Sequence, residues 1–241
     1  MRVALSKATF EAEITGRFGA AFKPQKPAAE IMATGIATVD AVIGGLPRGA
    51  ITEVFGAPSS GRTSFMLSVL EHAAAHKEVC ALIDTSDVFD PITAEEVQLD
   101  LDQLLWIRCA ANVEHAFKAT DLLLQGGGFG LVLLDLGDVA GKDARRIISS
   151  WWYRFRRTVE KTPTVLVVIA ADSCVRSCAS LALELSRETD AWSSATGIAL
   201  PPFANSPTHA NLLSGIKVQL DRHRPLNLGS RSAYFNAQAR A

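Results

Sequence analysis

Residues 56–64 have the residue types and spacing needed to hold phosphate groups. The segment reads Gly-Ala-Pro-Ser-Ser-Gly-Arg-Thr-Ser and matches the phosphate-loop pattern, with Arg62 in place of the usual lysine. Glycines let backbone N–H groups curl around phosphate oxygens, and the N-terminus of a following helix adds positive potential. The loop residues predicted to bind a nucleotide are Gly56, Ser59, Ser60, Gly61, Arg62, Thr63 and Ser64.

The cofactors that such a loop takes are ATP and Mg²⁺. The hydroxyl of Thr63 is the group that would hold the metal. Arg62 keeps a positive charge, but its planar guanidinium is bulkier than an ammonium group and is not a conservative replacement. The pattern alone leaves open whether ATP binds, and a Gly- and Ser-rich turn before a helix is the alternative.

The elements that position the loop are a predicted strand at 51–55 and a predicted helix at 63–76. Further apolar runs at 79–83, 131–134 and 164–170 predict buried strands, and the spacing at 142–160 predicts a helix. Short apolar strands separated by helices are typical of an α/β fold with a mostly parallel sheet flanked by helices.

The C-terminal part has a different pattern. Apolar and polar residues alternate at 181–185 and at 216–220, which predicts antiparallel strands at the edge of the sheet. Their connection, residues 188–211, is rich in Pro, Ser, Thr and Ala and is expected to be a loop. We divide the chain into an N-terminal helix and linker (1–33), a core (34–224) and a basic C-terminal tail (225–241), which either binds a partner or packs without order.

Bulk composition excludes several classes of protein. The 241 residues are 48% hydrophobic and carry a formal net charge of -1, so any contact with nucleic acid must be local. No run of 18 apolar residues is present, which argues against a membrane span. The four cysteines match no zinc or disulfide framework. We expect a reduced, cytoplasmic protein.

Several segments resemble bacterial RecA recombinases: residues 34–49, 51–64, 81–92, 99–105 and 129–135. The similarity covers about residues 10–225 and implies a RecA-like P-loop core. It also implies that helix 10–22 docks onto a neighbouring protomer and that Asp90 lies near the adenine. Asp135 would stand on the Mg²⁺ side of the nucleotide, and Arg222 and Arg224 would reach a neighbour's nucleotide across an interface. For the two arginines, a solvated strand end is the alternative.

The departures from RecA bear on activity. Ser86 stands where RecA has the glutamate that activates water. Because a hydroxyl cannot act as a general base at neutral pH, we expect the rate of ATP hydrolysis to be lower by roughly 10²–10⁴-fold. Thr93 replaces a stacking aromatic residue. The segments that resemble the RecA DNA loops are short, at 136–142 and 172–178. We therefore expect weak or absent ATPase activity and weak or indirect DNA binding.

This combination resembles ImuA, the RecA-like component of bacterial translesion mutagenesis operons. The resemblance implies an accessory role in DNA-damage-induced translesion synthesis during the SOS response. The implied partners are an ImuB-like Y-family polymerase homologue and an error-prone C-family DNA polymerase, with RecA as a further candidate and no membrane. Two alternatives stay open: a DNA-dependent ATPase of the recombinase class, and an inhibitor that caps RecA filaments through helix 10–22.

Two other groups of residues allow a chemical interpretation. Residues 151–157 mix aromatic and cationic side chains, which suits nucleic-acid stacking or an ordinary amphipathic helix. We favour the helix, with Trp151 and Phe155 on the sheet and Trp152 and Arg156 exposed. His72 and His76 have a spacing that can bind a metal, but no third ligand is evident, so solvent-facing side chains are the preferred interpretation.

Overall fold

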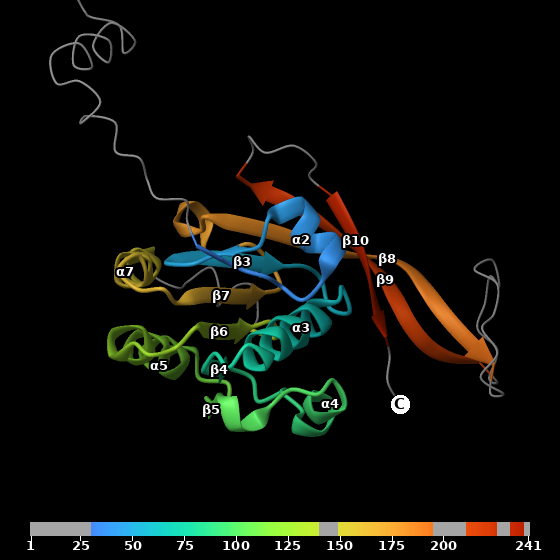
Figure 1. Cartoon of the computed structure of the whole chain (residues 1–241), viewed down its shortest axis with the longest axis horizontal. Helices are drawn as coiled ribbons and strands as arrows, with labels where there is room; N and C mark the ends of the chain where they lie inside the picture. Colours follow the sequence, from blue (N-terminus) through green and yellow to red (C-terminus); the bar gives the residue numbers. More distant parts are fainter. Residues whose placement is uncertain (1–29, 140–148, 195–210, 226–231, 239–241) are drawn as a thin grey trace, which may run out of the picture.

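The computed structural model describes residues 30–139, 149–194, 211–225 and 232–238 (Figure 1). Its helices and strands, in chain order, are β1 (Ile31–Met32), α2 (Ala37–Ile43), β2 (Leu46–Pro47), β3 (Ala50–Phe55), α3 (Arg62–Ala75), β4 (Cys80–Asp84), α4 (Pro91–Glu96), η2 (Leu101–Gln103), β5 (Leu104–Arg108), α5 (Val113–Gly126), β6 (Leu131–Leu136), α7 (Ser149–Val159), β7 (Val165–Ala170), η3 (Arg176–Cys178), β8 (Leu181–Ser194), β9 (Asn211–Arg224) and β10 (Ser232–Gln238). The strands and the helix predicted around the phosphate loop are all present, within one residue at most ends.

An eight-stranded sheet with the order β10-β9-β8-β3-β7-β6-β4-β5 forms the centre of the molecule. The strands from β8 to β5 run parallel to one another, while β9 and β10 are antiparallel to their neighbours. The predicted α/β fold, a mostly parallel sheet flanked by helices with antiparallel strands at the C-terminal edge, is thus confirmed. Strand β3, which leads into the phosphate loop, lies inside the sheet between β7 and β8.

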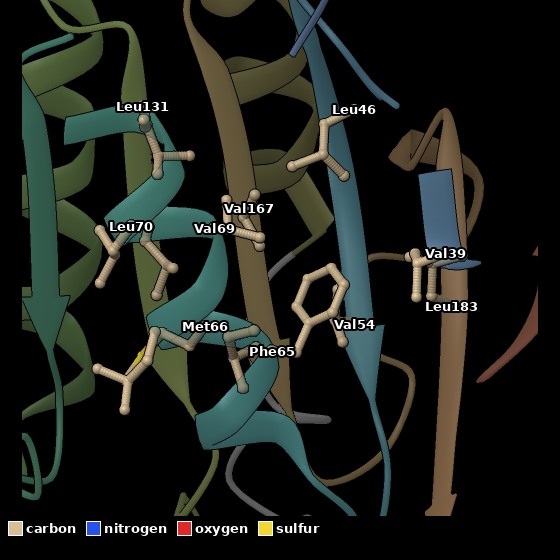
Figure 2. Packing of buried hydrophobic residues seen from close by; sticks show 14 of the residues in the cluster. Val39, Leu46, Val54, Phe65, Met66, Val69, Leu70, Leu131, Val167 and Leu183 are labelled. Carbon is tan, nitrogen blue, oxygen red and sulfur yellow. The ribbon is translucent and has the colours of Figure 1, made fainter. Parts of the chain in front are cut away.

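Helices cover both faces of the sheet because its central strands are apolar on both sides. Helices α2, α3 and α4 pack on one face, and α5 and α7 pack on the other (Figure 1). Along β6, Leu131 and Leu133 belong to the first core, and Val132 and Leu134 to the second, as the alternation of a strand requires. Figure 2 shows the first core, where α3 rests on the sheet through Phe65, Met66, Val69 and Leu70.

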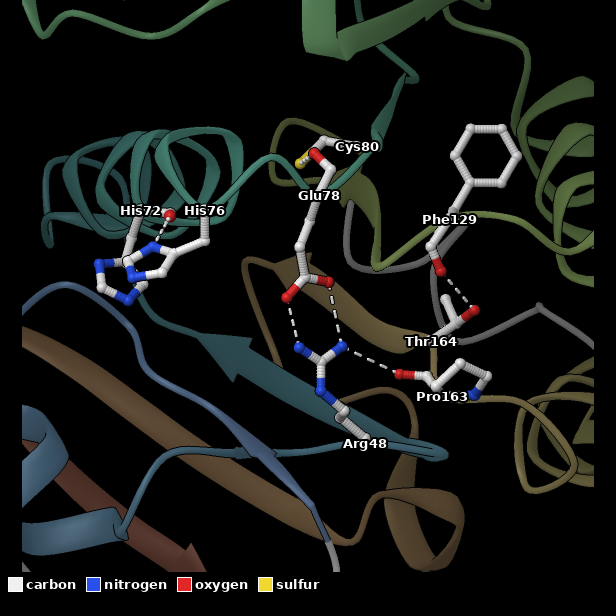
Figure 3. Close-up of polar contacts among 8 residues, drawn as sticks. All are labelled: Arg48, His72, His76, Glu78, Cys80, Phe129, Pro163 and Thr164. Atoms are coloured by element: carbon white, nitrogen blue, oxygen red, sulfur yellow. Dashed lines mark hydrogen bonds and ion pairs between the residues drawn. The ribbon is translucent and has the colours of Figure 1, made fainter.

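A polar cluster joins the amino ends of the central strands (Figure 3). Arg48, just before β3, donates to both carboxylate oxygens of Glu78 (one bond of 3.1 Å) and to the carbonyl of Pro163 at 3.2 Å. Hydrogen bonding to Glu78 raises the pKa of Arg48 above its ordinary value. Thr164 donates to the carbonyl of Phe129 at 2.7 Å. These residues precede four neighbouring strands, so their bonds help to align the strands whose other ends carry the site.

Two details of the C-terminal strands differ from expectation. Strand β8 is antiparallel to β9, as expected, but it joins β3 in parallel, because alternation reveals a buried face but not a strand direction. The loop expected over 188–211 is shorter, since β8 continues to Ser194 and β9 begins at Asn211. The two strands form a long hairpin that projects from the body of the sheet (Figure 1). An ion pair of 2.9 Å between Lys217 and Glu188 joins its polar part.

The C-terminal tail expected over 225–241 is corrected for its described part. Residues Ser232–Gln238 form β10, which pairs with β9 along its whole length. Three alternate side chains of this strand, Ala233, Phe235 and Ala237, are buried in the first core. The absence of acidic residues suggested a free basic tail, but the alternation of apolar side chains proved to be the stronger structural signal.

Helix α7 is amphipathic, as preferred for residues 151–157, but one of its tryptophans lies on the opposite side from that expected. Trp152 is only 3% exposed and Phe155 is fully buried, whereas Trp151 packs at the margin of the second core. The buried face therefore follows Trp152, Phe155 and Val159, a helical spacing of three and four residues. Arg156 is exposed, as expected, and pairs with Glu160 at 2.8 Å.

Some expectations fall outside the described residues. The helix predicted over 10–22 and nearly all of the linker at 23–30 belong to this group, as do residues 142–148 of the helix predicted at 142–160. Within the described ranges, no helix has both the length and the apolar character needed to cross a bilayer.

Candidate functional site

The predicted phosphate loop connects β3 to α3 and is packed tightly beneath the last strands of the sheet. Gly61 has a φ of 94°, a backbone conformation that favours glycine. A Cβ atom added to Gly61 would lie 2.5 Å from Cγ2 of Val218 in β9, and one added to Gly56 would lie 2.3 Å from the carbonyl oxygen of Leu185 in β8. Both glycines are therefore required by close packing, whatever the ligand.

The interior of the loop offers donors for an anion. The N-cap of α3 is Gly61, and no side chain caps the N–H groups of the first turn. Such N–H groups, at the positive end of a helix, are a ready site for phosphate. Ser60 is 2% exposed and its hydroxyl has no hydrogen-bond partner among the described residues. Ser59 has a φ of 62° and is exposed at the outer side of the loop.

A cavity of about 400 Å³ opens beside the first turn of α3. Thr63 and Ser64 line it from the loop side, and Thr93 lines it from α4. Asn236, from β10, contributes to a further wall. The structure thus brings two residues of the RecA-like segment 56–64 and Thr93, which directly follows the segment 81–92, to one cavity, with a volume suited to a small ligand.

Asp90 lies next to this cavity, at the N-terminus of α4. Its carboxylate accepts hydrogen bonds from the N–H groups of Ile92 (3.1 Å) and Thr93 (3.2 Å) and from the Thr93 hydroxyl (2.6 Å). These bonds, that of the hydroxyl first, lower the pKa of Asp90. Asp90 is exposed and stays ionised, and its predicted position near the adenine of a nucleotide remains a prediction. Its evident role here is to cap α4.

Arg62 turns away from the cavity toward the end of β6. Its Nη1 donates to the carbonyl of Gly137 at 2.8 Å, and the residue is only 9% exposed. Asp135, the last residue but one of β6, accepts a hydrogen bond of 2.8 Å from the Gly137 N–H. A Cβ atom on Gly137 would lie 2.9 Å from Oδ1 of Asp135 and 3.0 Å from Nη1 of Arg62. The guanidinium and the carboxylate therefore flank the same glycine.

The electrostatics at Asp135 are unusual for a metal ligand. The pKa of Asp135 is raised to about 6: burial raises it most, the Gly137 N–H lowers it, the charge of Asp84 raises it and the charge of Arg62 lowers it. Mg²⁺ needs an open octahedral shell of oxygen ligands. With a guanidinium already beside this carboxylate, the residues present do not fit a magnesium ion in the place predicted from Thr63 and Asp135. They do fit a phosphate group, which requires only donors and positive charge.

Ser86, at the position of the missing glutamate, is partly buried just beyond β4. The neighbouring carboxylates do not replace the base. Asp84 accepts from the N–H groups of Asp87 (2.7 Å), Val88 (3.1 Å) and Phe89 (2.9 Å) and so builds the turn. Asp87 points outward and forms an ion pair with Arg108.

Glu53 is a residue that the sequence analysis overlooked. It is 1% exposed, in the middle of β3, and its carboxylate accepts from the Ser173 hydroxyl at 2.9 Å and from the N–H groups of Cys174 and Val175 at 2.5 and 2.7 Å. It therefore holds the connection after β7, the short loop predicted at 172–178, against the core. A glutamate inside an apolar strand was the available signal.

The two arginines expected to act across an interface differ in position. Arg222 is 3% exposed, and its Nη1 donates to the carbonyl of Val42 at the end of α2 with a distance of 2.7 Å. This burial contradicts the solvated strand end, and the interface role of Arg222 remains a prediction. Arg224 is exposed and donates to the carbonyl of Arg176 at 2.8 Å, so its interface role remains a prediction.

The other candidate groups are the two histidines of α3 and the four cysteines. His76 Nδ1 lies 2.7 Å from the carbonyl oxygen of His72, and the two rings are 4.3 Å apart (Figure 3). No cluster of three metal-ligating side chains occurs within the described residues. The four cysteines, Cys80, Cys109, Cys174 and Cys178, are buried and unbridged. Burial raises the thiol pKa of each of them.

Comparison with known proteins agrees with this architecture. A family model described as the RecA N-terminal domain matches residues 11–148. The protein RecA of Haemophilus ducreyi is 38% identical over 108 residues, 44% of this chain and 29% of that protein. The protein RecA of Rickettsia canadensis is 29% identical over 156 residues, 58% of this chain and 45% of that protein. The matched part spans less than half the length of these relatives. Because this family model covers more than half of the chain, the protein belongs to the RecA family, and residues 11–148 correspond to the RecA N-terminal domain.

Proposed function

We propose that this chain is a RecA-like accessory protein of DNA repair, which binds a nucleotide but turns it over slowly or not at all. Its finer role, in the terms of the ImuA resemblance, is to assemble or regulate a translesion-synthesis complex after DNA damage. The observation that carries the proposal is the end of β4, where Ser86 has no carboxylate and both nearby aspartates are engaged in other bonds. A phosphate loop without a general base suits binding better than catalysis.

The connection after β7 supports a limited role for DNA. Between β7 and β8, Cys174, Val175 and Cys178 are buried in the second core, and Glu53 fixes the backbone of this segment. A segment held in this way cannot also extend along a single strand. DNA contact by this protein is therefore expected to be weak or to pass through partners.

The proposed partners are an ImuB-like Y-family polymerase homologue and an error-prone C-family DNA polymerase, with RecA as a third candidate. Affinity capture of the purified full chain with each purified partner tests this part. A truncation lacking residues 1–30 serves as the matched variant for RecA. Loss of RecA binding in that truncation supports capping through helix 10–22, and unchanged binding excludes it.

The first experiment on the chain alone measures ATP binding by calorimetry and turnover by phosphate release, with and without single-stranded DNA. We expect binding with little turnover and no stimulation. Strong DNA-stimulated hydrolysis would instead make the chain a divergent DNA-dependent ATPase and refute the accessory role.

A pair of variants at Ser86 tests the cause of the low turnover. Ser86→Glu adds a carboxylate, and Ser86→Gln adds a side chain of similar size without a base. Faster phosphate release in the first variant alone supports the missing base as the cause. Equal rates in both variants would place the block elsewhere in the site.

A further inference from the structure

The region between the phosphate loop and the end of β6 holds a cation that belongs to the chain itself. We propose that the guanidinium of Arg62 takes the place of the divalent cation, so that the loop binds a triphosphate without Mg²⁺. This inference deepens the proposed nucleotide binding and rests on it. It concerns the ion that accompanies the phosphates.

The position of Arg62 carries the argument. Its side chain is almost completely buried and reaches from the first residue of α3 to the carbonyl of Gly137, 75 residues further along the chain, at 2.8 Å. The Oδ1 of Asp135 accepts from the N–H of the same glycine at 2.8 Å. A magnesium ion held between Thr63 and Asp135 would have to share this small region with a fixed positive charge.

The chemistry of the two cations leads to the same conclusion. Mg²⁺ requires oxygen ligands at about 2.0–2.1 Å in octahedral geometry and is bound chiefly by carboxylates and phosphates. Asp84, which lies opposite Asp135 on the neighbouring strand β4, is buried and already accepts three backbone N–H groups of its own turn. Asp84 is therefore committed to its own turn and is not available to offset the repulsion between a metal ion and Arg62.

Arg62 can also supply what the metal would otherwise supply to the phosphates. A guanidinium has five N–H donors in a rigid fork and binds phosphate oxygens in pairs. One donor of Arg62 is engaged with Gly137, and the structure gives no other hydrogen bond to this side chain within the described ranges. The remaining donors lie next to a helix N-terminus that lacks a side-chain cap.

The test is calorimetric titration of ATP in excess Mg²⁺ and in EDTA, for the wild type, Arg62→Lys and Arg156→Lys. Lysine keeps the charge but lacks the fork, so it cannot hold Gly137 in the same way. We expect wild-type affinities in the two buffers to agree within about twofold and Arg62→Lys to bind at least about tenfold more tightly with Mg²⁺. Arg156, on the exposed side of α7, is the matched control and should behave as the wild type.

The outcomes separate this inference from the proposed function. ATP binding by the wild type only in Mg²⁺ would overturn the inference and leave nucleotide binding intact. No binding by the wild type in either buffer would overturn the nucleotide part of the proposed function. In that case the Arg62→Lys variant tests the inference. ATP binding by this variant in Mg²⁺ alone would support displacement of the metal by Arg62, and no ATP binding in either buffer would refute it.

A second measurement covers the case in which Arg62→Lys does not fold, as judged by circular dichroism. The wild-type protein is titrated into Mn²⁺ and ATP, and protein-bound Mn²⁺ is followed by electron paramagnetic resonance. We expect ATP to bind without carrying Mn²⁺ onto the protein, because the guanidinium occupies the place of the metal. Uptake of Mn²⁺ together with ATP would overturn the inference.

Discussion

Gly61→Ala is the substitution that tests most directly how the last strands hold the phosphate loop. Gly61 has a φ of 94°, and a methyl group there would meet Cγ2 of Val218 at 2.5 Å, well inside van der Waals contact. Both atoms lie in a packed region, since Val218 is fully buried in the first core. The methyl group can therefore be accommodated only if β9 or the loop moves.

The expected loss of stability in Gly61→Ala has two parts. A non-glycine residue in a left-handed conformation costs roughly 1–2 kcal/mol. Extra volume in a packed core costs about 1–3 kcal/mol more. We expect Gly61→Ala to lower the free energy of unfolding by about 2–5 kcal/mol in total. Gly44→Ala is the matched control, because Gly44 has a φ of 77° and a methyl group added there would meet no atom within 4 Å, so it should lose only about 1–2 kcal/mol.

The assay is urea unfolding followed by far-ultraviolet circular dichroism, with Val218→Ala as the second mutation of a double-mutant cycle. Val218→Ala alone should cost about 2 kcal/mol through the buried methyl groups it removes. In the double variant the clash is relieved, so the combined cost should fall short of additivity by about 1–3 kcal/mol. Additive effects, or a Gly61→Ala variant no less stable than Gly44→Ala, would refute the contact between the loop and β9.

Three further predictions concern charged side chains. Arg48→Ala should lower the free energy of unfolding by about 1–3 kcal/mol, because it leaves Glu78 without its bidentate partner. Arg156→Ala, in an exposed ion pair, should lower it by at most about 1 kcal/mol. Urea unfolding of the two variants compares these losses. Glu53→Gln should cost about 1–3 kcal/mol and speed hydrogen exchange in the connection after β7. The pKa of Asp135 is raised to about 6 in the folded protein, above its unfolded value of about 4. The protonated carboxyl therefore contributes stability below about pH 4, and this contribution is lost as the pH rises through about 6. Asp135→Asn should remove this pH dependence from unfolding curves measured across that range.

Each of these predictions has a result that contradicts it. Equal losses for the two arginine variants would mean that the cluster at the amino ends of the strands contributes no more than a surface pair. Unchanged exchange in Glu53→Gln would mean that the connection after β7 is held by its apolar residues alone. An Asp135→Asn variant with the same pH dependence as the wild type would show that another group titrates.

The fold was largely predictable from local patterns. Apolar runs at 51–55, 79–83, 131–134 and 164–170 became β3, β4, β6 and β7, because a strand covered on both faces must be apolar throughout. The helix after the loop, its glycines and the alternating strands near the C-terminus were equally readable. Strand direction was not, since β8 is parallel to β3 although it has the same alternation as the antiparallel β9. Direction depends on the connection, and side-chain periodicity does not report it.

The site divides along the same line. The sequence by itself determined which residues form the phosphate loop, that Ser86 replaces a base and that Arg62 replaces a lysine, because these are matters of residue type and spacing. Only the tertiary structure decided that Arg62 bonds Gly137, that Glu53 holds the connection after β7 and that Arg222 is buried beneath α2. The partners in these bonds are 75, 121 and 180 residues apart in the chain. The hydrogen-bond partner of a buried charged side chain is determined by packing between segments that are distant in the chain. A local sequence pattern therefore does not predict it.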